Sequence, residues 1–556
     1  MVFASIRRFI GDPSAAARRI SGLATCLGLS LCLGLAPLQA ASAIPPQPGY
    51  IFELAGPQAL RAVLSTALPA DLRTFGVKRD ELEHFYAQRD FAPLLITETG
   101  WRPDTIPTLA LMQAAGAHGL KPANYWDDGL ADLAGPTEPG RMVHQDLMLT
   151  AATLRYGSDI YNGRYAKSPK QDAASLLAGF DDGDDLPAFL TALAPNKPEY
   201  EGLQTVLADM RQGSVRPLPG IGEGPLLSLG TRDPTVVQLR LHLAATGDLR
   251  LDSPHDGQHG ESGTVVEADR FDAALDEAVR AYQARHGLVV DGIIGRKSKA
   301  RMIASPEDRL GLVLANLERL RWEERLISQK HVRVNIANFH LVARDGKEDR
   351  LSMPVVVGRN SRRTPVISDQ IVSLKFSPDW TVPRSILEKD YLSSLRADPG
   401  FAIVEGFEVY KDGALISPYR VQWHDPRILR KVTLRKPPSS FGPLGGVRFS
   451  LTNDMAIFLH DTPSTDLFDL SQRAHSSGCV RVAEPEALAA YLLEGTSWDD
   501  QRISRAMLAG SIQIAKPVEP VQVFLSYMTA FVDADGRLQV VSDPYQLDED
   551  LISRLM

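Results

Sequence analysis

The sequence has few cysteines, and their positions matter more than their number. It contains three in 556 residues, and Cys26 and Cys32 both lie in an apolar segment near the N-terminus. Cys479 is therefore the only thiol in the rest of the chain, which excludes an internal disulfide there. A free thiol outside the cytoplasm is open to oxidation, so its presence needs another explanation. Nucleophilic catalysis by Cys479 is the leading interpretation, and an inert buried cysteine is the alternative.

Excess positive charge and long apolar runs are also scarce. Lys and Arg number 60 against 68 Asp and Glu, which gives a formal net charge of −8. Binding to a phosphate backbone needs a basic surface, so no nucleic-acid partner is expected. A hydrophobic content of 44% is typical of a soluble globular protein. The length predicts about two to four domains.

The N-terminus has the order of an export signal. Arginines at positions 7, 8, 18 and 19 precede the apolar stretch 20–38, and small residues follow as far as Ala43. This order predicts a signal peptide over residues 1–43 and export of the remaining chain. The apolar stretch is nearly long enough to span a bilayer, so an uncleaved N-terminal membrane anchor is the alternative.

The chain after the signal divides by its periodicity. Residues 44–225 carry apolar residues at helical spacing and predict a helical scaffold. Residues 226–304 predict a small helical module, in which Tyr282-Gln283 and Gly287-Leu288 end a helix and Val290-Asp291-Gly292 forms a turn. Residues 305–328 predict a helix that returns to the scaffold.

A mostly β domain is predicted over residues 329–556, where short β-rich runs are separated by Gly, Pro, Asp and Asn. Residues 384–440 interrupt this pattern and predict a capping insertion, or lid, over the active site. The expected fold class is therefore multidomain α+β, with a helical scaffold, a small helical module and a mostly β domain.

Cys479 and His460 form the candidate catalytic pair. His460 ends the strand-like run Ala456–Leu459, and Cys479 follows Ser476-Ser477-Gly478. A thiol attacks carbonyls as the thiolate and therefore needs a base. Small residues before the cysteine let the backbone amides of Ser477, Gly478 and Cys479 turn toward one point as an oxyanion hole.

Three questions about this pair stay open at the sequence level. The side chain or the backbone carbonyl of Asp461 is a candidate for orienting His460, and so is a carbonyl elsewhere. His475 is a second candidate for the base. A zinc site made of His460, His475 and Cys479 is conceivable, but there is no second cysteine at ligand spacing, so no metal is expected.

These residues resemble the L,D-transpeptidase family with a YkuD-type catalytic domain, in its large periplasmic YcbB-like subfamily. Leu459–Pro463 reads L-H-D-T-P, and Ser476–Val482 reads S-S-G-C-V-R-V. Ser477 replaces the usual second histidine of the family, as is typical of this subfamily, and Phe458 stands where a tyrosine is often found. The module at 226–304 resembles a peptidoglycan-binding module.

The resemblance implies a periplasmic enzyme of cell-wall biogenesis and cell shape. It would form 3→3 peptidoglycan cross-links by acyl transfer from a tetrapeptide stem, through a Cys479 thioester, to an amine of another stem. Catalysis would rest on Cys479, His460, Ser477 and Gly478. Substrate contacts would come from Arg481, Trp423, Phe458, Ser476 and Asp461, although Arg481 could instead brace its loop.

The same resemblance implies partners and leaves alternatives open. Stem peptides are the expected substrates, carbapenem β-lactams the expected inhibitors, and other cell-wall synthesis proteins possible partners; no cofactor is expected. An L,D-carboxypeptidase or an enzyme that attaches proteins to peptidoglycan would use the same nucleophile. A non-enzymatic wall-binding scaffold is the third alternative, against which the paired His460 and Cys479 argue.

Overall fold

The computed structural model of the 556-residue chain describes most, but not all, of its residues. The described ranges are 56–65, 75–97, 100–125, 139–167, 171–181, 183–213, 220–222, 224–249, 268–286, 288–302, 305–323, 328–439, 442–533 and 536–556. The predicted signal peptide lies outside them. The chain forms two compact units, which divide after Ala194, with Ala117–Gly119 belonging to the second unit.

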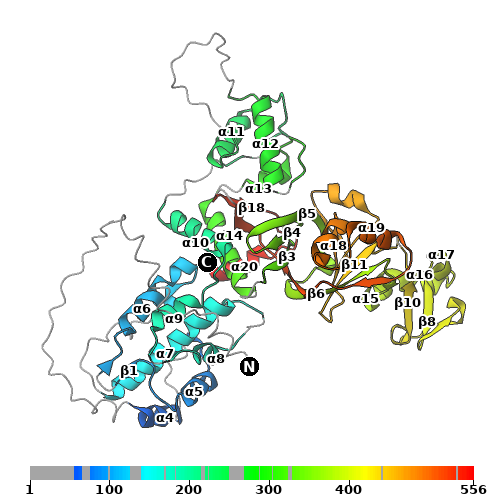
Figure 1. Ribbon diagram of the computed structural model, residues 1–556. Coiled ribbons are helices and arrows are strands. Elements are labelled where there is room, and N and C mark those ends of the chain that lie inside the picture. The colour runs from blue at the N-terminus through cyan, green and yellow to red at the C-terminus, as the bar shows by residue number, and fades with distance from the viewer. Residues whose placement is uncertain are drawn as a thin grey trace. The chain divides into compact units, whose positions relative to one another are not determined.

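The first unit is helical (Figure 1). Its elements are α4 (Pro57–Ser65), α5 (Arg79–Ala87), the hairpin of β1 (Ile96–Thr97) and β2 (Gly100–Trp101), α6 (Thr105–Gln113), α7 (Pro139–Asn162), α8 (Ala173–Leu177) and α9 (Leu186–Ala192). Asp146 of α7 lies fully buried in this unit. Its carboxylate accepts hydrogen bonds from the Tyr86 hydroxyl at 2.8 Å and the Leu95 amide at 2.7 Å. The scaffold helices predicted from apolar spacing are present in this unit.

The second unit begins with helices. These are α10 (Pro198–Arg211), α11 (Pro234–Ala245), α12 (Ala273–Arg285), α13 (Arg296–Arg301) and α14 (Pro306–Trp322). Helices α11 and α12 share a small core that includes Leu239 and Tyr282. The turn after α12 is fixed by Asp291, which accepts hydrogen bonds from Gln283 and from the Ile293 amide, both at 2.9 Å. Gly292 has φ +74°, a conformation that favours glycine.

A ten-stranded sheet dominates the rest of the second unit. Its strands are β3 (Lys330–Asn335), β4 (His340–Asp345), β5 (Glu348–Gly358), β6 (Ile367–Phe376), β11 (Val447–Leu451), β12 (Leu459–His460), β13 (Ala474–Ser476), β14 (Val480–Val482), β15 (Gln513–Ala515) and β16 (Val521–Ser526). The main order is β11-β12-β14-β5-β4-β3-β16-β6-β15, and β11 also pairs with β6. The ladder therefore closes on itself.

Helices α18 (Pro485–Leu493) and α19 (Asp500–Leu508) pack against the apolar face of this sheet. Leu488 of α18 and Ile503 of α19 share one core with Phe449 and Val480. The C-terminal part adds β17 (Ala530–Val532), β18 (Leu538–Val540) and α20 (Asp548–Leu555). The chain thus has the predicted α+β fold class: helical N-terminal region, small helical module and mostly β C-terminal domain.

The segment predicted as a capping insertion forms a separate small structure. Strands β7 (Trp380–Thr381), β8 (Glu408–Lys411), β9 (Ala414–Ile416) and β10 (Val432–Lys436) make a four-stranded sheet in the order β7-β10-β8-β9. The helical turns α15 (Arg384–Ile386), η6 (Leu387–Tyr391), α16 (Leu392–Ala397) and α17 (Phe401–Val404) complete it. Leu395, Trp423 and Leu434 belong to its own core.

Within the described residues, no helix combines the length and the apolar character needed to cross a membrane.

Candidate active site

The loop before β14 is held by hydrogen bonds from a buried serine. Ser476 Oγ accepts the Gly478 amide at 3.1 Å and donates to the Cys479 carbonyl at 2.6 Å. Thr364 Oγ1 donates to the Gly478 carbonyl at 2.7 Å. Gly478 has φ +120°, and a Cβ there would lie 3.3 Å from Ile457 Cδ1, so the backbone conformation and the close contact both favour glycine. These contacts fix the backbone on both sides of Cys479.

Cys479 directly precedes β14 and is partly exposed. Its thiol donates a hydrogen bond to the Ala456 carbonyl at 3.5 Å. Burial of the sulfur raises the pKa of Cys479 to about 11, against the lowering influence of a backbone hydrogen bond of Phe458 and of the cations Arg448 and Arg481. Cys479 is therefore a neutral thiol at pH 7.

His460 lies on the strand β12, next to the strand β14 that Cys479 precedes. Strands β12 and β14 are parallel, with Leu459 opposite Val480 and His460 opposite Arg481. The His460 side chain is 5% exposed, and its Nδ1 lies 2.5 Å from the Asp461 carbonyl oxygen. Since a carbonyl can only accept, Nδ1 carries the proton and Nε2 is the free basic nitrogen.

The charge state of His460 follows from its surroundings. Burial lowers its pKa to about 3; the Asp461 carbonyl acts in the opposite direction, and the cations Arg481 and Arg448 lower the pKa further. The imidazole is therefore neutral at pH 7. In the described part of the chain, the thiol bonds to Ala456 and no hydrogen bond joins it to the His460 ring. The resting pair is thus a neutral base beside a neutral thiol.

A row of polar side chains crosses this part of the sheet. Antiparallel pairing places Lys375 of β6 opposite Arg448 of β11, and Arg448 opposite His460; parallel pairing places His460 opposite Arg481. Partners in register point to the same face, and alternate residues point to the other. The alternate residues are apolar and buried in the core: Val447, Phe449, Leu459, Val480 and Val482. Alternation along these short strands thus places the polar side chains on one face of the sheet and the core residues on the other.

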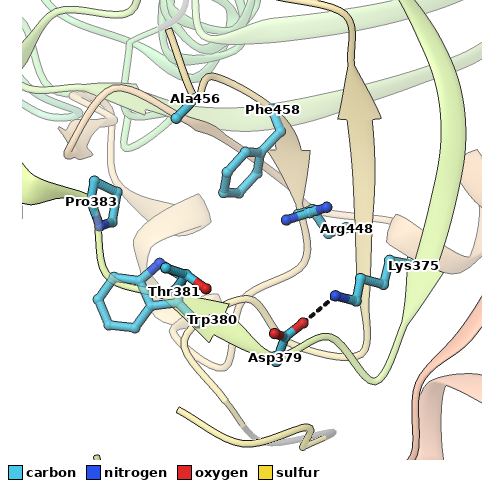
Figure 2. Close-up of a pocket in the computed structure, with 8 residues that line it drawn as sticks. All are labelled: Lys375, Asp379, Trp380, Thr381, Pro383, Arg448, Ala456 and Phe458. Carbon is cyan, nitrogen blue, oxygen red and sulfur yellow. Dashed lines mark hydrogen bonds and ion pairs between the residues drawn. The ribbon is translucent and has the colours of Figure 1, made fainter. Parts of the chain in front are cut away.

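A cavity of about 300 Å³ lies beside this row (Figure 2). Its walls are Lys375, Asp379, Trp380, Thr381, Pro383, Arg448, Ala456 and Phe458. The Phe458 ring meets the His460 ring edge-on, with centroids 5.7 Å apart, and Arg448 stacks over Phe458 at 5.2 Å. Phe458, predicted as a substrate contact, therefore lines a cavity next to the catalytic pair.

Asp461 and Ser477 make contacts that the sequence left open. The Asp461 carbonyl, rather than its carboxylate, contacts His460; the carboxylate accepts the Gly446 amide at 2.7 Å and the Thr462 amide at 2.6 Å. The Ser477 side chain is exposed and accepts a hydrogen bond from Arg362 at 3.0 Å. Arg362 also forms a bidentate ion pair with Asp390 of the insertion, so it connects the insertion to the loop that contains Cys479.

The structure corrects the interpretation of Trp423. The indole is 2% exposed, lies in the core of the insertion, and donates to the Pro418 carbonyl at 2.9 Å. Its role is to stabilise the insertion, because a small structure with its own sheet needs a large apolar side chain inside. The substrate contact predicted for Trp423 is therefore wrong.

His475 and Arg481, the other two candidates from the sequence, lie in different surroundings. His475 is exposed on β13, and its Nε2 bonds to the Gln472 carbonyl at 2.8 Å. Arg481 lies beside His460, and its Nε is buried without a partner among the described residues. Over the same residues, no group of three or more His, Cys, Asp and Glu is placed to hold a metal ion.

Arg448 also lies in this row of polar side chains, and the sequence alone does not single it out. Its signal is a charged side chain between the apolar Val447 and Phe449 in a short strand. That pattern predicts a polar face, but only the pairing of β11 with β12 places Arg448 next to His460.

Comparison with known families agrees with this geometry. Residues 329–508 match the L,D-transpeptidase catalytic domain, YkuD. The chain contains an L,D-transpeptidase catalytic domain. Residues 80–207 match a scaffold domain, and residues 232–302 match a model described as "Putative peptidoglycan binding domain". The combination of catalytic and wall-binding domains supports transpeptidase-type chemistry.

Two curated proteins are similar to parts of the chain. A Haemophilus influenzae protein named "Putative L,D-transpeptidase" is 32% identical over 222 residues, which is 39% of this chain and 44% of that protein. The N-acetylmuramoyl-L-alanine amidase CwlM of Mycobacterium tuberculosis is 38% identical over 95 residues, 17% of this chain and 22% of CwlM. The chain therefore spans less than half the length of either relative.

Solved L,D-transpeptidase structures give weaker matches. One from Xylanimonas cellulosilytica is 14% identical and covers 55% of this chain and 98% of its own, with a TM-score of 0.19. One from Stackebrandtia nassauensis is 13% identical and covers 56% of this chain and 98% of its own, with a TM-score of 0.21.

Proposed function

We propose that the protein is a cysteine L,D-transpeptidase that forms 3→3 cross-links between peptidoglycan stem peptides. The observation that carries the proposal is the position of Cys479 beside the strand of His460, whose Nδ1 is held by the Asp461 carbonyl. The matches to a catalytic domain and a peptidoglycan-binding domain support the substrate class.

The first half-reaction acylates the enzyme. The proton of the Cys479 thiol passes to Nε2 of His460 as sulfur attacks the carbonyl of the third residue of a tetrapeptide stem. The tetrahedral adduct then loses the terminal D-alanine, whose amine takes the proton from His460. A C–S bond has formed, a C–N bond has broken, and the stem remains as a thioester.

The second half-reaction transfers the acyl group. The side-chain amine of another stem attacks the thioester, and His460 accepts a proton from that amine. Cys479 leaves as thiolate and recovers the proton from His460. One amide bond forms and one D-alanine is released per cross-link, so the enzyme returns unchanged.

The neutral resting pair defines the role of His460. Because the pKa of His460 is lowered to about 3 and that of Cys479 is raised to about 11, both by burial, a preformed thiolate–imidazolium pair is disfavoured. His460 would act as a general base during attack. The amides of Ser477 and Cys479 are the proposed oxyanion donors, since the Gly478 amide already donates to Ser476.

Arg481 is proposed to bind a carboxylate of the stem. Its Nε is buried without a partner among the described residues, and it lies in register with His460. An unpartnered guanidinium donor beside a reacting centre suits an anionic substrate. β-Lactams of the carbapenem class are proposed inhibitors, because their strained carbonyl would be attacked by Cys479 in the same way.

The decisive experiment incubates the protein with disaccharide-tetrapeptide and follows products by mass spectrometry. We expect a cross-linked dimer and one free D-alanine per dimer, with neither from Cys479→Ala. Free D-alanine without a dimer would instead support an L,D-carboxypeptidase. A dimer formed by the Cys479→Ala variant would refute the proposed nucleophile.

Export to the periplasm through residues 1–43 stays part of the proposal. Edman sequencing or mass analysis of the protein recovered from the periplasm would show a chain that begins near residue 44. A chain that keeps its first residues and fractionates with membranes would support the anchor instead.

A further inference from the structure

The guanidinium of Arg448 has a donor that nothing in the described structure satisfies. Its Nε is buried and makes no hydrogen bond among the described residues. Nη2 donates to Ser450 Oγ at 3.2 Å. A buried unpaired donor is costly in a folded protein unless a ligand completes it. The face of the sheet that carries Arg448 also carries His460, its partner in register.

The cavity that Arg448 lines and the Cys479 sulfur have one neighbour in common, Ala456. Ala456 forms part of the cavity wall, and its carbonyl oxygen lies 3.5 Å from Cys479 Sγ. Phe458 forms another part and holds the guanidinium by stacking at 5.2 Å. Figure 2 shows the guanidinium pointing toward the middle of the cavity, with Trp380 and Thr381 on the opposite wall. A group bound there would lie within a few atoms of the scissile bond.

The charges around the cavity favour an anion. Asp379 is the carboxylate in its wall, and it is already ion-paired with Lys375 and, at 2.8 Å, with Arg435. In Figure 2 the Lys375 ammonium is turned to Asp379, whereas Arg448 is not. The cation left facing the space is therefore Arg448. A planar guanidinium can hold both oxygens of a carboxylate.

We infer that this cavity binds the C-terminal carboxylate of the donor stem, with Arg448 as the residue that recognises it. The inference rests on the proposed acyl transfer. The terminal carboxylate belongs to the residue directly after the scissile carbonyl, so it lies within about one Cα–Cα step, 3.8 Å, of the reacting residue. The other carboxylates of the stem sit on a side chain or on the far side of the acyl group. Arg448 would thus make the enzyme specific for stems that end in a free acid one residue after the site of attack.

The test compares two donors that differ in one group. One is a tetrapeptide stem that ends in the free acid, and the other is the same stem that ends in a carboxamide. We expect the wild-type kcat/KM to favour the free acid by about tenfold to a hundredfold, the worth of a charge-assisted hydrogen bond. Arg448→Gln should remove that preference by slowing the free acid alone, and Arg448→Lys should restore part of it.

Arg502→Gln is the matched control. Arg502 stacks over Trp498 at 4.1 Å, as Arg448 stacks over Phe458, but it lies on α19 and outside the cavity wall. The control should keep the full preference. If Arg448→Gln lowered kcat/KM equally for the free-acid and the carboxamide donor, Arg448 would only support Phe458, and the inference would be overturned.

A binding experiment separates this inference from the proposed reaction. In a Cys479→Ala background, calorimetry should show tighter binding of the free acid than of the amide, and Arg448→Gln should abolish the difference. If this preference appears although the wild type makes no product, the carboxylate site stands and the proposed reaction fails. If product forms from both donors at equal rates and they bind equally, the reaction stands and the carboxylate site is refuted. With neither product nor preference, both fail.

Discussion

The neutral resting pair makes a quantitative prediction about the reactivity of Cys479. Burial raises the pKa of this thiol to about 11, so only about 1 in 10,000 molecules carries the thiolate at pH 7. An ordinary cysteine with a pKa near 8.5 has about 3 in 100 as thiolate. The thiolate fraction of Cys479 at pH 7 is therefore about 300-fold smaller than that of an ordinary cysteine. A more basic thiolate is also a stronger nucleophile, so each Cys479 thiolate should react about 10- to 20-fold faster than an ordinary one. The two effects together predict that Cys479 reacts about 20-fold more slowly than free cysteine.

The assay is alkylation by iodoacetamide, followed by mass spectrometry of the peptide that contains Cys479. Mapping the peptide removes any contribution from Cys26 and Cys32. We expect the rate to rise about tenfold per pH unit up to at least pH 10, because the thiolate alone reacts. Alkylation of the unfolded protein gives the reference curve, with a midpoint near that of an ordinary cysteine.

His460→Gln distinguishes the neutral pair from an ion pair. The His460 ring is uncharged at pH 7, since burial lowers its pKa to about 3, so the substitution removes no charge and should leave the alkylation curve in place. The same variant should lose acylation by substrate, because the general base is gone. In a thiolate–imidazolium pair, removal of the histidine would raise the thiol pKa. A wild-type alkylation midpoint below pH 7 that moves upward in His460→Gln would refute the neutral pair.

Three further predictions concern stability and backbone geometry. Trp423→Ala should destabilise the insertion by about 3–5 kcal/mol, because it leaves a cavity and removes the indole hydrogen bond to the Pro418 carbonyl, and hydrogen exchange should rise over residues 384–440 alone. Gly478→Ala should abolish carbapenem adduct formation at a melting temperature within a few degrees of wild type, since φ +120° and the 3.3 Å approach to Ile457 displace the nucleophile loop. Burial raises the pKa of Asp146 to about 6, so the folded state binds this proton more tightly than the unfolded chain; the stability it contributes is present below about pH 4 and is lost as pH rises to about 6. Hydrogen exchange of α7 should show lower stability at pH 7 than at pH 4.5 in the wild type, and no such difference in Asp146→Asn.

The sequence could single out Cys479 and His460 as a candidate pair because the signals that mark them are local. His460 and Cys479 each stand where a short β-rich run meets turn residues, and the glycine before the cysteine signals a backbone that approaches something closely. The fold class was predictable for a similar reason, since helical and strand periodicity change near residue 329. Both depend on patterns within a few residues, which pairing and packing only refine.

The errors and omissions concern contacts that are not local. An aromatic residue in a charged, irregular segment looks like a surface contact, and Trp423 was interpreted in that way. The sequence does not show that residues 380–436 form their own sheet, and it is this sheet that buries the indole. The choice between the carbonyl and the carboxylate of Asp461 depends on where the Gly446 amide lies, which no spacing in the chain reveals.

Arg448 shows how strand register creates a site that spacing conceals. Lys375, Arg448, His460 and Arg481 come from four separate strands. The three cations each lie between two apolar neighbours because one sheet face is core. A shift of one residue in the pairing of β11 would turn Phe449 toward the histidine and Arg448 into the core. In the core the guanidinium would lose its hydrogen bond to Ser450 and its stacking on Phe458, so the free energy that fixes the register also places the cation beside His460. Arg448→Gln keeps a polar side chain at this position and leaves Val447 and Phe449 in the core, so it is expected to change donor preference without allowing the strand to slip.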